Sequence, residues 1–416
     1  PAYPDAPLSP PAIERVPYLV LGTVDSWKQL GTIYADLLRP QLRPTPDLEQ
    51  IVQEVIDGAD GRREVVERLY RWLLENTRYV ALEFGIHAIK PYPTDLVLRR
   101  RHGDCKDKAS LLVTMLELAG VRSRVALVRT RNQGRIDTGI PVFDAFNHAI
   151  VYVPGEDLWL DGTVLHHGPG ELPLPDREAL ALIVDPGGDE DGSGSGRLVT
   201  TPPAEPSSSS VDRTDRVRLE RSGAAGIETR IEARGEAAAQ ARSRMRLADD
   251  RRGALRGYLQ RTRPELDVDD VDVGAIGLED SPVRYGYSGR LLRFAQRTGQ
   301  TLSARLAVEF PSLPLRMPTQ DRRVPMWLPD PFSWSQRTVF EIPREARVAE
   351  VPSSATLDSP WGTLRLDVRQ RRGQVVCELE VVFRGGRVPV DRLDRFGTFA
   401  RDARQLLDQR ILLEWP

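Results

Sequence analysis

The hydrophobic pattern of the chain has a helical period in its first third and a strand period in most of the remainder. The clearest helical stripe recurs at the i, i+3, i+4 and i+7 spacing of a buried face and consists of Cys105, Ala109, Leu112, Met115, Leu116 and Ala119. Gly103 and Asp104 precede it as turn and cap, and Gly120 follows as a stop signal. We therefore predict a helix that begins at Cys105.

The segments around this helix predict a mixed helix and sheet domain. Ahead of it we expect a Pro-rich linker at 1–17, a short strand at 16–21, helices at about 26–38, 47–57 and 62–76, and a strand at 78–82. Residues 83–104 contain Pro91 and Pro93 and are expected to form a loop. After the helix we expect a strand at 121–130 and a hairpin at 147–163.

The hairpin brings two candidate functional residues onto one face of its sheet. Its tight turn is expected to pair Val153 with Leu158. In that register His148 faces Thr163, and Asp161 lies diagonally beside His148, within reach of a side-chain hydrogen bond. A slip by one residue would put the two side chains on opposite faces, so the prediction depends on this register.

The clearest domain boundary is a Gly-, Ser- and Pro-rich linker at 185–210. Asp189 and Asp191 within it faintly resemble a calcium loop, but no Glu closes the loop and a solvated linker is favoured. Beyond it we expect many short strands, one long helix at about 236–260 and a closing helix at 393–407. The predicted parts are a linker and lead-in at 1–47, a core at 48–184, the linker at 185–210, an α+β domain at 211–318 and a β-sandwich-like domain at 319–416.

Composition sets limits on the classes of function. The 416 residues carry a net charge of −2, which gives no reason to expect a nucleic acid or an anionic membrane as partner. No run of 18 or more apolar residues is present, so no membrane span is expected. The two cysteines make no disulfide framework and do not report the redox compartment. We interpret the start at Pro1, without Met or signal peptide, as a piece of a longer or processed product, and the oligomeric state stays open.

Cys105 is the main candidate for chemistry. A thiol in the first turn of a helix lies among unpaired backbone N–H groups at the positive end of the helix dipole, which favours the nucleophilic thiolate. Two of the four lysines in the chain, Lys106 and Lys108, flank this cysteine and add positive charge nearby. The alternative is a buried structural cysteine. We interpret Cys377 in that way, because it shares a strand face with apolar neighbours.

Together with His148 and Asp161, Cys105 makes up the set that a cysteine enzyme needs. The thiolate attacks a carbonyl, the imidazole moves the proton, and the carboxylate fixes the imidazole tautomer. The backbone N–H of Cys105 is a natural oxyanion donor. Candidates for a second oxyanion donor or a supporting neighbour are Tyr79, Tyr92, Asn147, Asp104 and Lys106.

Other ionisable residues are given structural interpretations. His166 and His167 could ligate a metal, but no Cys or third His stands at ligand spacing, so a solvated loop is favoured. Surface, supporting or helix-capping roles are expected for His87, His102 and the pair of Asp104 and Asp107. We therefore predict no metal and no other cofactor.

Four stretches of the sequence resemble the bacterial transglutaminase-like superfamily. They are Arg78-Tyr79-Val80, His102-Gly103-Asp104-Cys105-Lys106-Asp107-Lys108-Ala109, Phe146-Asn147-His148 and Trp159-Leu160-Asp161-Gly162-Thr163. The resemblance covers about 48–184, and the tail resembles the β-rich C-terminal region of this group only loosely. It implies a papain-like α+β core, with helices packed on an antiparallel sheet and β-rich, sandwich-like domains after it. It also implies Cys105 as nucleophile, His148 as base, Asp161 as orienting acid, and an exported bacterial protein.

We expect a cysteine-dependent enzyme that transfers an acyl group from an amide bond of a peptide or protein through a thioester. Hydrolysis is favoured over cross-linking, because nothing in the sequence marks a second amine site. The resemblance leaves two alternatives open, since the superfamily also contains transamidating and inactive members. These are an enzyme like protein-glutamine γ-glutamyltransferase and a non-catalytic module that binds a protein or glycan. A metallohydrolase based on His166 and His167 is the least supported reading.

Overall fold

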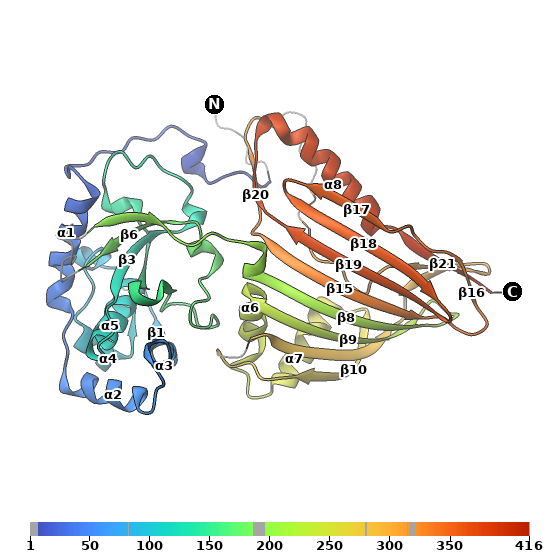
Figure 1. Ribbon diagram of the computed structural model, residues 1–416, viewed down its shortest axis with the longest axis horizontal. Coiled ribbons are helices and arrows are strands. Elements are labelled where there is room, and N and C mark those ends of the chain that lie inside the picture. The colour runs from blue at the N-terminus through green and yellow to red at the C-terminus, as the bar shows by residue number, and fades with distance from the viewer. Residues whose placement is uncertain are drawn as a thin grey trace. The chain divides into compact units, whose positions relative to one another are not determined.

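The computed structural model describes residues 7–81, 83–185, 196–278, 281–313, 315 and 322–415 (Figure 1). The chain forms two compact units, one of Pro11–Ala204 and one of Glu205–Pro416 together with Pro1–Pro10. Each unit has a hydrophobic core of its own.

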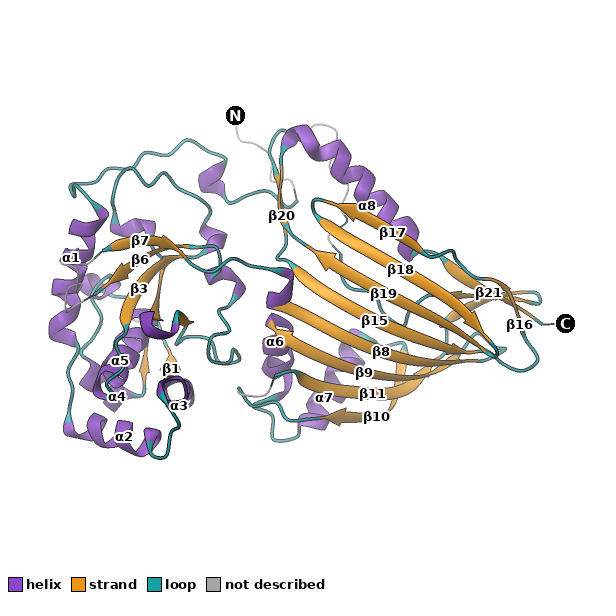
Figure 2. Ribbon diagram, in the orientation of Figure 1, coloured by secondary structure: helices purple, strands orange, loops and turns teal. Residues whose placement is uncertain are grey.

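The first unit is built on a five-stranded antiparallel sheet with the order β5-β4-β3-β6-β7. Figure 2 labels β3, β6 and β7 of this sheet. Its strands are β3 (Arg124–Arg129), β4 (His148–Val153), β5 (Leu158–Leu160), β6 (Leu180–Val184) and β7 (Arg197–Thr200). Its helices are α1 (Trp27–Leu38), α2 (Pro46–Ile56), α3 (Arg62–Asn76), α4 (Thr94–Arg100) and α5 (Cys105–Leu118). Helices packed on an antiparallel sheet are the α+β core that the sequence predicted.

Helix α5 lies at the centre of this unit. It contacts β3 and β4 as well as α2, α3 and α4. Every residue from Cys105 to Leu116 is buried, including both lysines of the first turn. The sequence predicted a single buried stripe, but the structure surrounds this helix on all sides, so its polar residues also need partners inside the protein.

A capping box fixes the start of α5. The Asp104 side chain accepts a hydrogen bond from the Asp107 N–H, and the Asp107 side chain accepts one from the Asp104 N–H, both at 3.2 Å. Asp107 Oδ1 also accepts a hydrogen bond of 2.7 Å from the backbone N–H of Tyr92. The short strands β1 (Arg78–Tyr79) and β2 (His102–Gly103) pair in parallel just ahead of this cap. They hold the two ends of the intervening segment together.

The first unit differs from the sequence prediction in three places. Residues 16–21 form no strand, and Leu19 and Leu21 are more than 80% exposed. The expected loop at 83–104 contains α4, a seven-residue helix whose pattern is too short to stand out between prolines. Part of the expected linker at 185–210 is a strand, β7, which pairs with β6. The weak calcium-loop candidates Asp189 and Asp191 lie outside the described residues.

The second unit is organised around an eight-stranded sheet with the order β10-β11-β9-β8-β15-β19-β18-β17. Its strands are β8 (Ser209–Leu219), β9 (Ala225–Gly235), β10 (Leu266–Val273), β11 (Val283–Leu291), β15 (Phe332–Glu341), β17 (Ala355–Ser359), β18 (Gly362–Arg371) and β19 (Gln374–Phe383). The smaller sheets are β12-β13-β21-β16 and β14-β20. Their strands are β12 (Ala295–Thr298), β13 (Thr301–Arg305), β14 (Met326–Leu328), β16 (Arg347–Glu350), β20 (Gly386–Val388) and β21 (Arg410–Glu414).

Two features of this unit differ from the sequence prediction. The boundary expected between 211–318 and 319–416 falls within one sheet, because β8 and β15 pair in parallel from opposite sides of it. The single helix expected at about 236–260 is two helices, α6 (Glu236–Met245) and α7 (Arg251–Thr262). Asp250 starts the second one by accepting a hydrogen bond of 2.8 Å from the Gly253 N–H. The closing helix α8 (Leu393–Leu407) lies where the sequence predicted it.

A buried ion pair lies in the core of the second unit. Arg213 Nε donates to both carboxylate oxygens of Asp215, and neither side chain is more than 1% exposed. Thr229 and Gln336 also donate to Asp215, each at 2.7 Å. These bonds satisfy the pair, so we interpret it as structural.

None of the described helices in either unit has the length and apolar character needed to span a membrane.

We expect Gly103→Ala to destabilise the first unit. A Cβ at this position would lie 2.6 Å from the Cβ of Asp107, so the capping box has to shift. Loss of the cap should lower the free energy of unfolding by about 1–2 kcal/mol. Denaturant unfolding measures this, and the control is Gly226→Ala, whose Cβ would only touch Arg218 at 4.0 Å. Equal effects of the two changes would contradict the packing argument.

Candidate active site

Cys105 occupies the first position of α5. Its backbone N–H therefore has no carbonyl partner within the helix. The residue is 8% exposed, and its side chain is near enough to the His148 imidazole to contribute to the raised pKa of that residue. The structure thus brings together the thiol and the imidazole that the sequence selected from two distant segments.

His148 begins β4, and Asp161 follows β5 directly. His148 Nε2 lies 3.2 Å from Asp161 Oδ2. Val153 pairs with Leu158, which is the hairpin register that the sequence predicted. Asp161 Oδ1 is held in place by hydrogen bonds from the backbone N–H of Thr163 at 2.8 Å and from its hydroxyl at 2.7 Å. The carboxylate is therefore fixed on one side and turned toward the imidazole on the other.

The charges around His148 favour its protonated form. Burial opposes the imidazolium, but the Asp161 carboxylate and the hydrogen bonds to Asp161 and Cys105 outweigh it, so the pKa of His148 is raised well above its usual value. Burial also opposes the Asp161 carboxylate, yet the imidazolium and the Thr163 hydrogen bonds lower the pKa of Asp161. At neutral pH the site therefore holds a positive imidazole and a negative Asp161.

Asp176 is a member of this group that sequence analysis missed. It ends a 3-10 turn, η7 (Leu174–Asp176), and its Oδ2 lies 3.8 Å from His148 Nε2. The segment between β5 and β6 has no periodic pattern, and no motif marks this residue. Among the described residues, His148, Asp161 and Asp176 form the one group whose atoms lie close enough together for a shared metal ion. A cation there would have to displace the hydrogen bond between His148 and Asp161, and we assign none.

The two lysines after Cys105 do not act as the sequence analysis expected. Lys106 Nζ donates to the Asp104 carboxylate within the cap, so its charge is already balanced. Lys108 Nζ donates to the backbone carbonyl of Thr77 at 3.0 Å. Burial, opposed by the Asp161 charge, lowers the pKa of Lys108 to about 8. Both lysines are buried and have partners inside the protein, whereas the sequence suggested only that they add positive charge near the thiol.

Tyr79 is the oxyanion candidate whose pKa is affected by the charge of Cys105. Its β1 position pairs with Gly103, two residues before Cys105. Burial, followed by the charge of Cys105, raises the pKa of Tyr79 to about 12. The phenol therefore keeps its proton and can donate a hydrogen bond. At 46% exposed, the residue also reaches solvent, where a substrate would arrive.

The other two oxyanion candidates have structural roles. Tyr92 supports the cap through its backbone, and its ring stacks on His87 with centroids 3.6 Å apart. The Asn147 amide forms hydrogen bonds with the backbone and hydroxyl of Thr130 at 2.9 Å. Neither side chain is turned to the thiol by these bonds. Asp104 and Lys106 pair with each other at the start of the helix.

The remaining histidines lie outside the site. The ring of His87 contacts the carbonyl of Lys90 at 3.0 Å, and the ring of His102 contacts that of Arg100 at 2.9 Å. His166 and His167 are half-buried in the loop after the hairpin. Neither belongs to a group of three potential metal ligands among the described residues.

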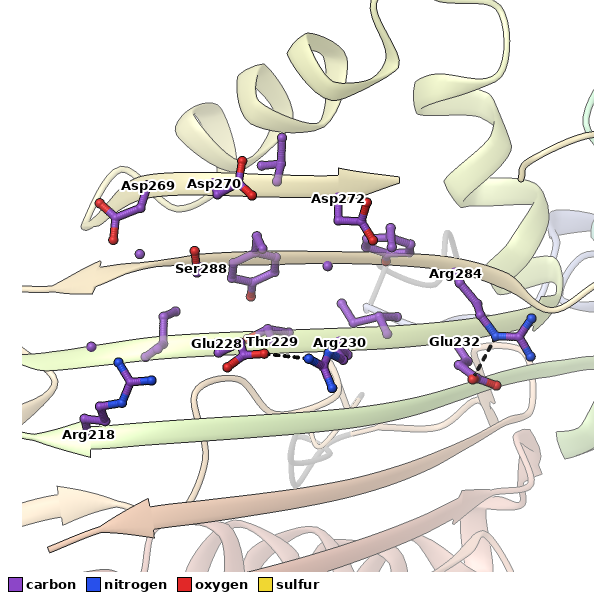
Figure 3. Close-up of a pocket in the computed structure, with 18 residues that line it drawn as sticks. Arg218, Glu228, Thr229, Arg230, Glu232, Asp269, Asp270, Asp272, Arg284 and Ser288 are labelled. Atoms are coloured by element: carbon purple, nitrogen blue, oxygen red, sulfur yellow. Dashed lines mark hydrogen bonds and ion pairs between the residues drawn. The ribbon is translucent and has the colours of Figure 1, made fainter. Parts of the chain in front are cut away.

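A separate hollow of about 640 Å³ lies on the eight-stranded sheet of the second unit (Figure 3). Most of its labelled side chains are charged, and they come from β8, β9, β10 and β11. Arg284 donates to Glu232 at 2.9 Å, and Arg230 donates to Glu228 at 2.8 Å. Exposed ion pairs of this kind are typical of a solvated sheet face. The hollow contains none of the predicted site residues, and we assign it no function.

Comparison with known families finds a known domain within the first unit. A model of the transglutaminase-like superfamily matches residues 49–161, a range that contains Cys105, His148 and Asp161. Residues 49–161 form a transglutaminase-like domain. No curated protein matches the chain at a significant level.

Solved structures show that the likeness extends beyond the transglutaminase-like domain. A crystal structure described as "a putative protease" from Parabacteroides distasonis matches with a TM-score of 0.55 and 13% identity, over 93% of this chain and 59% of that one. The chain thus spans less than two thirds of that protein, and at this identity the match shows the fold alone. A second, described as "a putative cysteine protease" from Cytophaga hutchinsonii, has a TM-score of 0.26 and 16% identity over 39% of this chain and 51% of that one.

Replacing Lys108 by Met tests the cost of its buried charge. The folded pKa of about 8 is below the unfolded value of about 10.4, so the unfolded state holds the proton more tightly and stability rises with pH between these values. We expect Lys108→Met to raise the free energy of unfolding by about 2 kcal/mol at pH 7, after loss of the Thr77 hydrogen bond, and by much less at pH 10.5. Denaturant unfolding at both pH values measures this. The control Lys28→Met replaces an exposed lysine and should leave the free energy of unfolding unchanged at both pH values. If Lys108→Met raised this free energy equally at pH 7 and at pH 10.5, the argument would be refuted.

Proposed function

We propose that this chain is a cysteine-dependent acyl-transfer enzyme that cleaves an amide bond of a peptide or protein through a thioester on Cys105. One observation carries the proposal. His148 Nε2 lies 3.2 Å from Asp161 Oδ2, and Cys105 and Asp161 both contribute to the raised pKa of this imidazole. The transglutaminase-like domain around these residues supports it.

The arrangement supports a two-step reaction. The Cys105 thiolate attacks the amide carbonyl carbon, and the His148 imidazolium gives its proton to the leaving amine as the C–N bond breaks. This leaves a thioester on Cys105 and a neutral imidazole. His148 then takes a proton from water as the water oxygen attacks the thioester, and breaking of the C–S bond releases the carboxylic acid and restores the Cys105 thiolate beside the imidazolium. Asp161 keeps the imidazole in the required tautomer and stabilises its charged form.

Two donors are available for the negative oxygen that develops on the carbonyl. The Cys105 N–H at the start of α5 is one of them. We assign the second to the Tyr79 phenol, because its raised pKa of about 12 keeps it protonated beside the sulfur. A helix N-terminus further favours negative charge at this point.

Water is the acceptor that we favour. It is always present, and the sequence marks no second amine site. The Parabacteroides neighbour is described as a putative protease, which agrees with a peptide substrate. Transfer of the acyl group to an amine, as in a protein-glutamine γ-glutamyltransferase, would use the same thioester and differ only in the second step.

The first test is alkylation by iodoacetamide, followed by mass spectrometry. We expect Cys105 to react rapidly at pH 6, because the imidazolium of His148 favours its thiolate. Cys377 should stay unmodified in the same protein, since it is 3% exposed and burial raises its pKa to about 12. His148→Ala should slow the Cys105 reaction at least tenfold, whereas the control His87→Ala should not. If Cys105 reacts no faster than Cys377, the chain is a non-catalytic module in this form.

A second test follows the thioester itself with p-nitrophenyl acetate. We expect a burst of p-nitrophenolate equal to the amount of enzyme, and its absence in Cys105→Ser. Tyr79→Phe should slow the burst on the order of 10²-fold, because one oxyanion donor is lost, while the control Tyr152→Phe should match the wild type. Hydroxylamine added after the burst competes with water, and the ratio of hydroxamate to acetate measures the preferred acceptor. A burst that persists in Cys105→Ser would remove Cys105 as the nucleophile.

A further inference from the structure

A second carboxyl group lies beside the imidazole of the proposed triad. Asp176 Oδ2 is 3.8 Å from His148 Nε2, and Asp176 is 2% exposed. This oxygen has no hydrogen-bond partner in the structure, although it is buried. The backbone of Asp176 is fixed, because its carbonyl accepts a hydrogen bond of 2.5 Å from the Thr201 hydroxyl. An unpartnered buried carboxyl oxygen aimed at a catalytic imidazole needs an explanation.

The closeness of Asp161 limits the charge that Asp176 can carry. Polar atoms of His148, Asp161 and Asp176 all lie within 4.8 Å of one another. Two carboxylates at such a distance do not both ionise easily, so they hold one proton between them. Burial, reinforced by the negative charge of Asp161, raises the pKa of Asp176 to about 8. At neutral pH the two acids therefore carry one negative charge, although either one alone would be ionised in water.

We propose that Asp176 is a positioning residue for His148 that shares one proton with Asp161. In neutral solution Asp176 is the protonated partner and can donate to the Asp161 carboxylate. In mildly alkaline solution the pair loses this proton, and a second negative charge then faces the imidazolium and holds it in its charged form. This inference rests on the proposed function in so far as His148 is the base, but its test does not depend on turnover.

Other charged or titratable groups surround this pair on the elements packed against it. They are Tyr70 on α3, Lys108 on α5, Glu171 and Arg177 in the loop that carries Asp176, and Arg131 on the 3-10 turn packed against it. The Tyr70 hydroxyl donates to the Asp161 carbonyl at 2.9 Å, and Arg177 Nε donates to the Leu172 carbonyl at 2.8 Å. Lys108 donates to Thr77. His148 Nε2 lies within 4 Å of both carboxyl groups, 3.2 Å from Asp161 Oδ2 and 3.8 Å from Asp176 Oδ2.

The deciding experiment is a titration of the His148 imidazole by NMR in protein labelled with ¹⁵N at histidine. The chain has five histidines. The set of imidazole signals that disappears in His148→Gln belongs to His148. Asp176→Asn keeps the size of the side chain and mimics its neutral form. We expect it to leave the imidazole unchanged at pH 6 and to lower the midpoint of its deprotonation by about one pH unit or more. Asp176→Ser provides a second uncharged variant if the first does not fold.

The rate of alkylation at Cys105 provides a second measure of the charge on the His148 imidazole. Iodoacetate is negatively charged and is attracted by the imidazolium, whereas iodoacetamide is neutral. The ratio of their rate constants at Cys105 therefore falls as His148 loses its proton. We expect this fall to occur at lower pH in Asp176→Asn than in the wild type. The matched control is Asp185→Asn, which removes another buried acid, paired with Arg124 at 2.7 Å, and should leave the ratio unchanged.

The outcomes separate this inference from the proposed function. If Cys105 depends on His148 but Asp176→Asn shifts neither midpoint, the role of Asp176 is refuted and the triad stands. If His148→Ala leaves Cys105 reactivity unchanged, the proposed function fails instead. A midpoint shift shared by Asp185→Asn would reflect general loosening and would also overturn the inference. Stoichiometric Zn²⁺ binding that Asp176→Asn abolishes would assign the cluster to a cation and refute proton sharing.

Discussion

The reciprocal hydrogen bonds between Asp104 and Asp107 are the constraint on which the site depends. They fix the residue where α5 starts, and so they fix both the sulfur and the N–H of Cys105. Two buried acids so close together are costly unless their oxygens are satisfied. The Lys106 ammonium and the Tyr92 N–H supply the missing partners. Asp104, Lys106 and Asp107, which look like a charged helix start in the sequence, are thus a buried group of mutually bonded side chains. Replacing any one of them by a residue without these bonds would leave a buried charge unpaired.

The partners of the sulfur come from a different part of the domain. The β4–β5 hairpin supplies His148 and Asp161, and the segment after it returns to supply Asp176. Helix α5 and this sheet edge each carry buried ionisable groups. Asp161 connects them, because its charge acts on His148 and also on Lys108. The site is therefore an electrostatic contact between two packed elements, and its protonation state is a property of the group rather than of single residues.

The sequence predicted the parts of this site that repeat or pair locally. The apolar spacing after Cys105 indicated the helix, and the short turn before Leu158 indicated the register that brings Asp161 to His148. It could not reveal Asp176, because a loop without periodicity carries no signal for where it folds back. It also did not reveal that Lys108 is buried, because the burial of α5 on all sides depends on three other helices, α2, α3 and α4. The boundary expected at 318 was misplaced for a related reason, as strand pairing between distant segments leaves no local pattern.

The parallel pairing of β8 with β15 has a consequence for how the protein is made. About 120 residues separate the two strands along the chain, and β9 covers only one edge of β8. At a synthesis rate of roughly 5–20 residues per second, the other edge of β8 stays without its partner on the order of ten seconds on the ribosome. An uncovered edge of eleven residues is a template for pairing with foreign strands. The β-rich unit therefore exposes a strand edge that needs protection from aggregation until β15 has been synthesised.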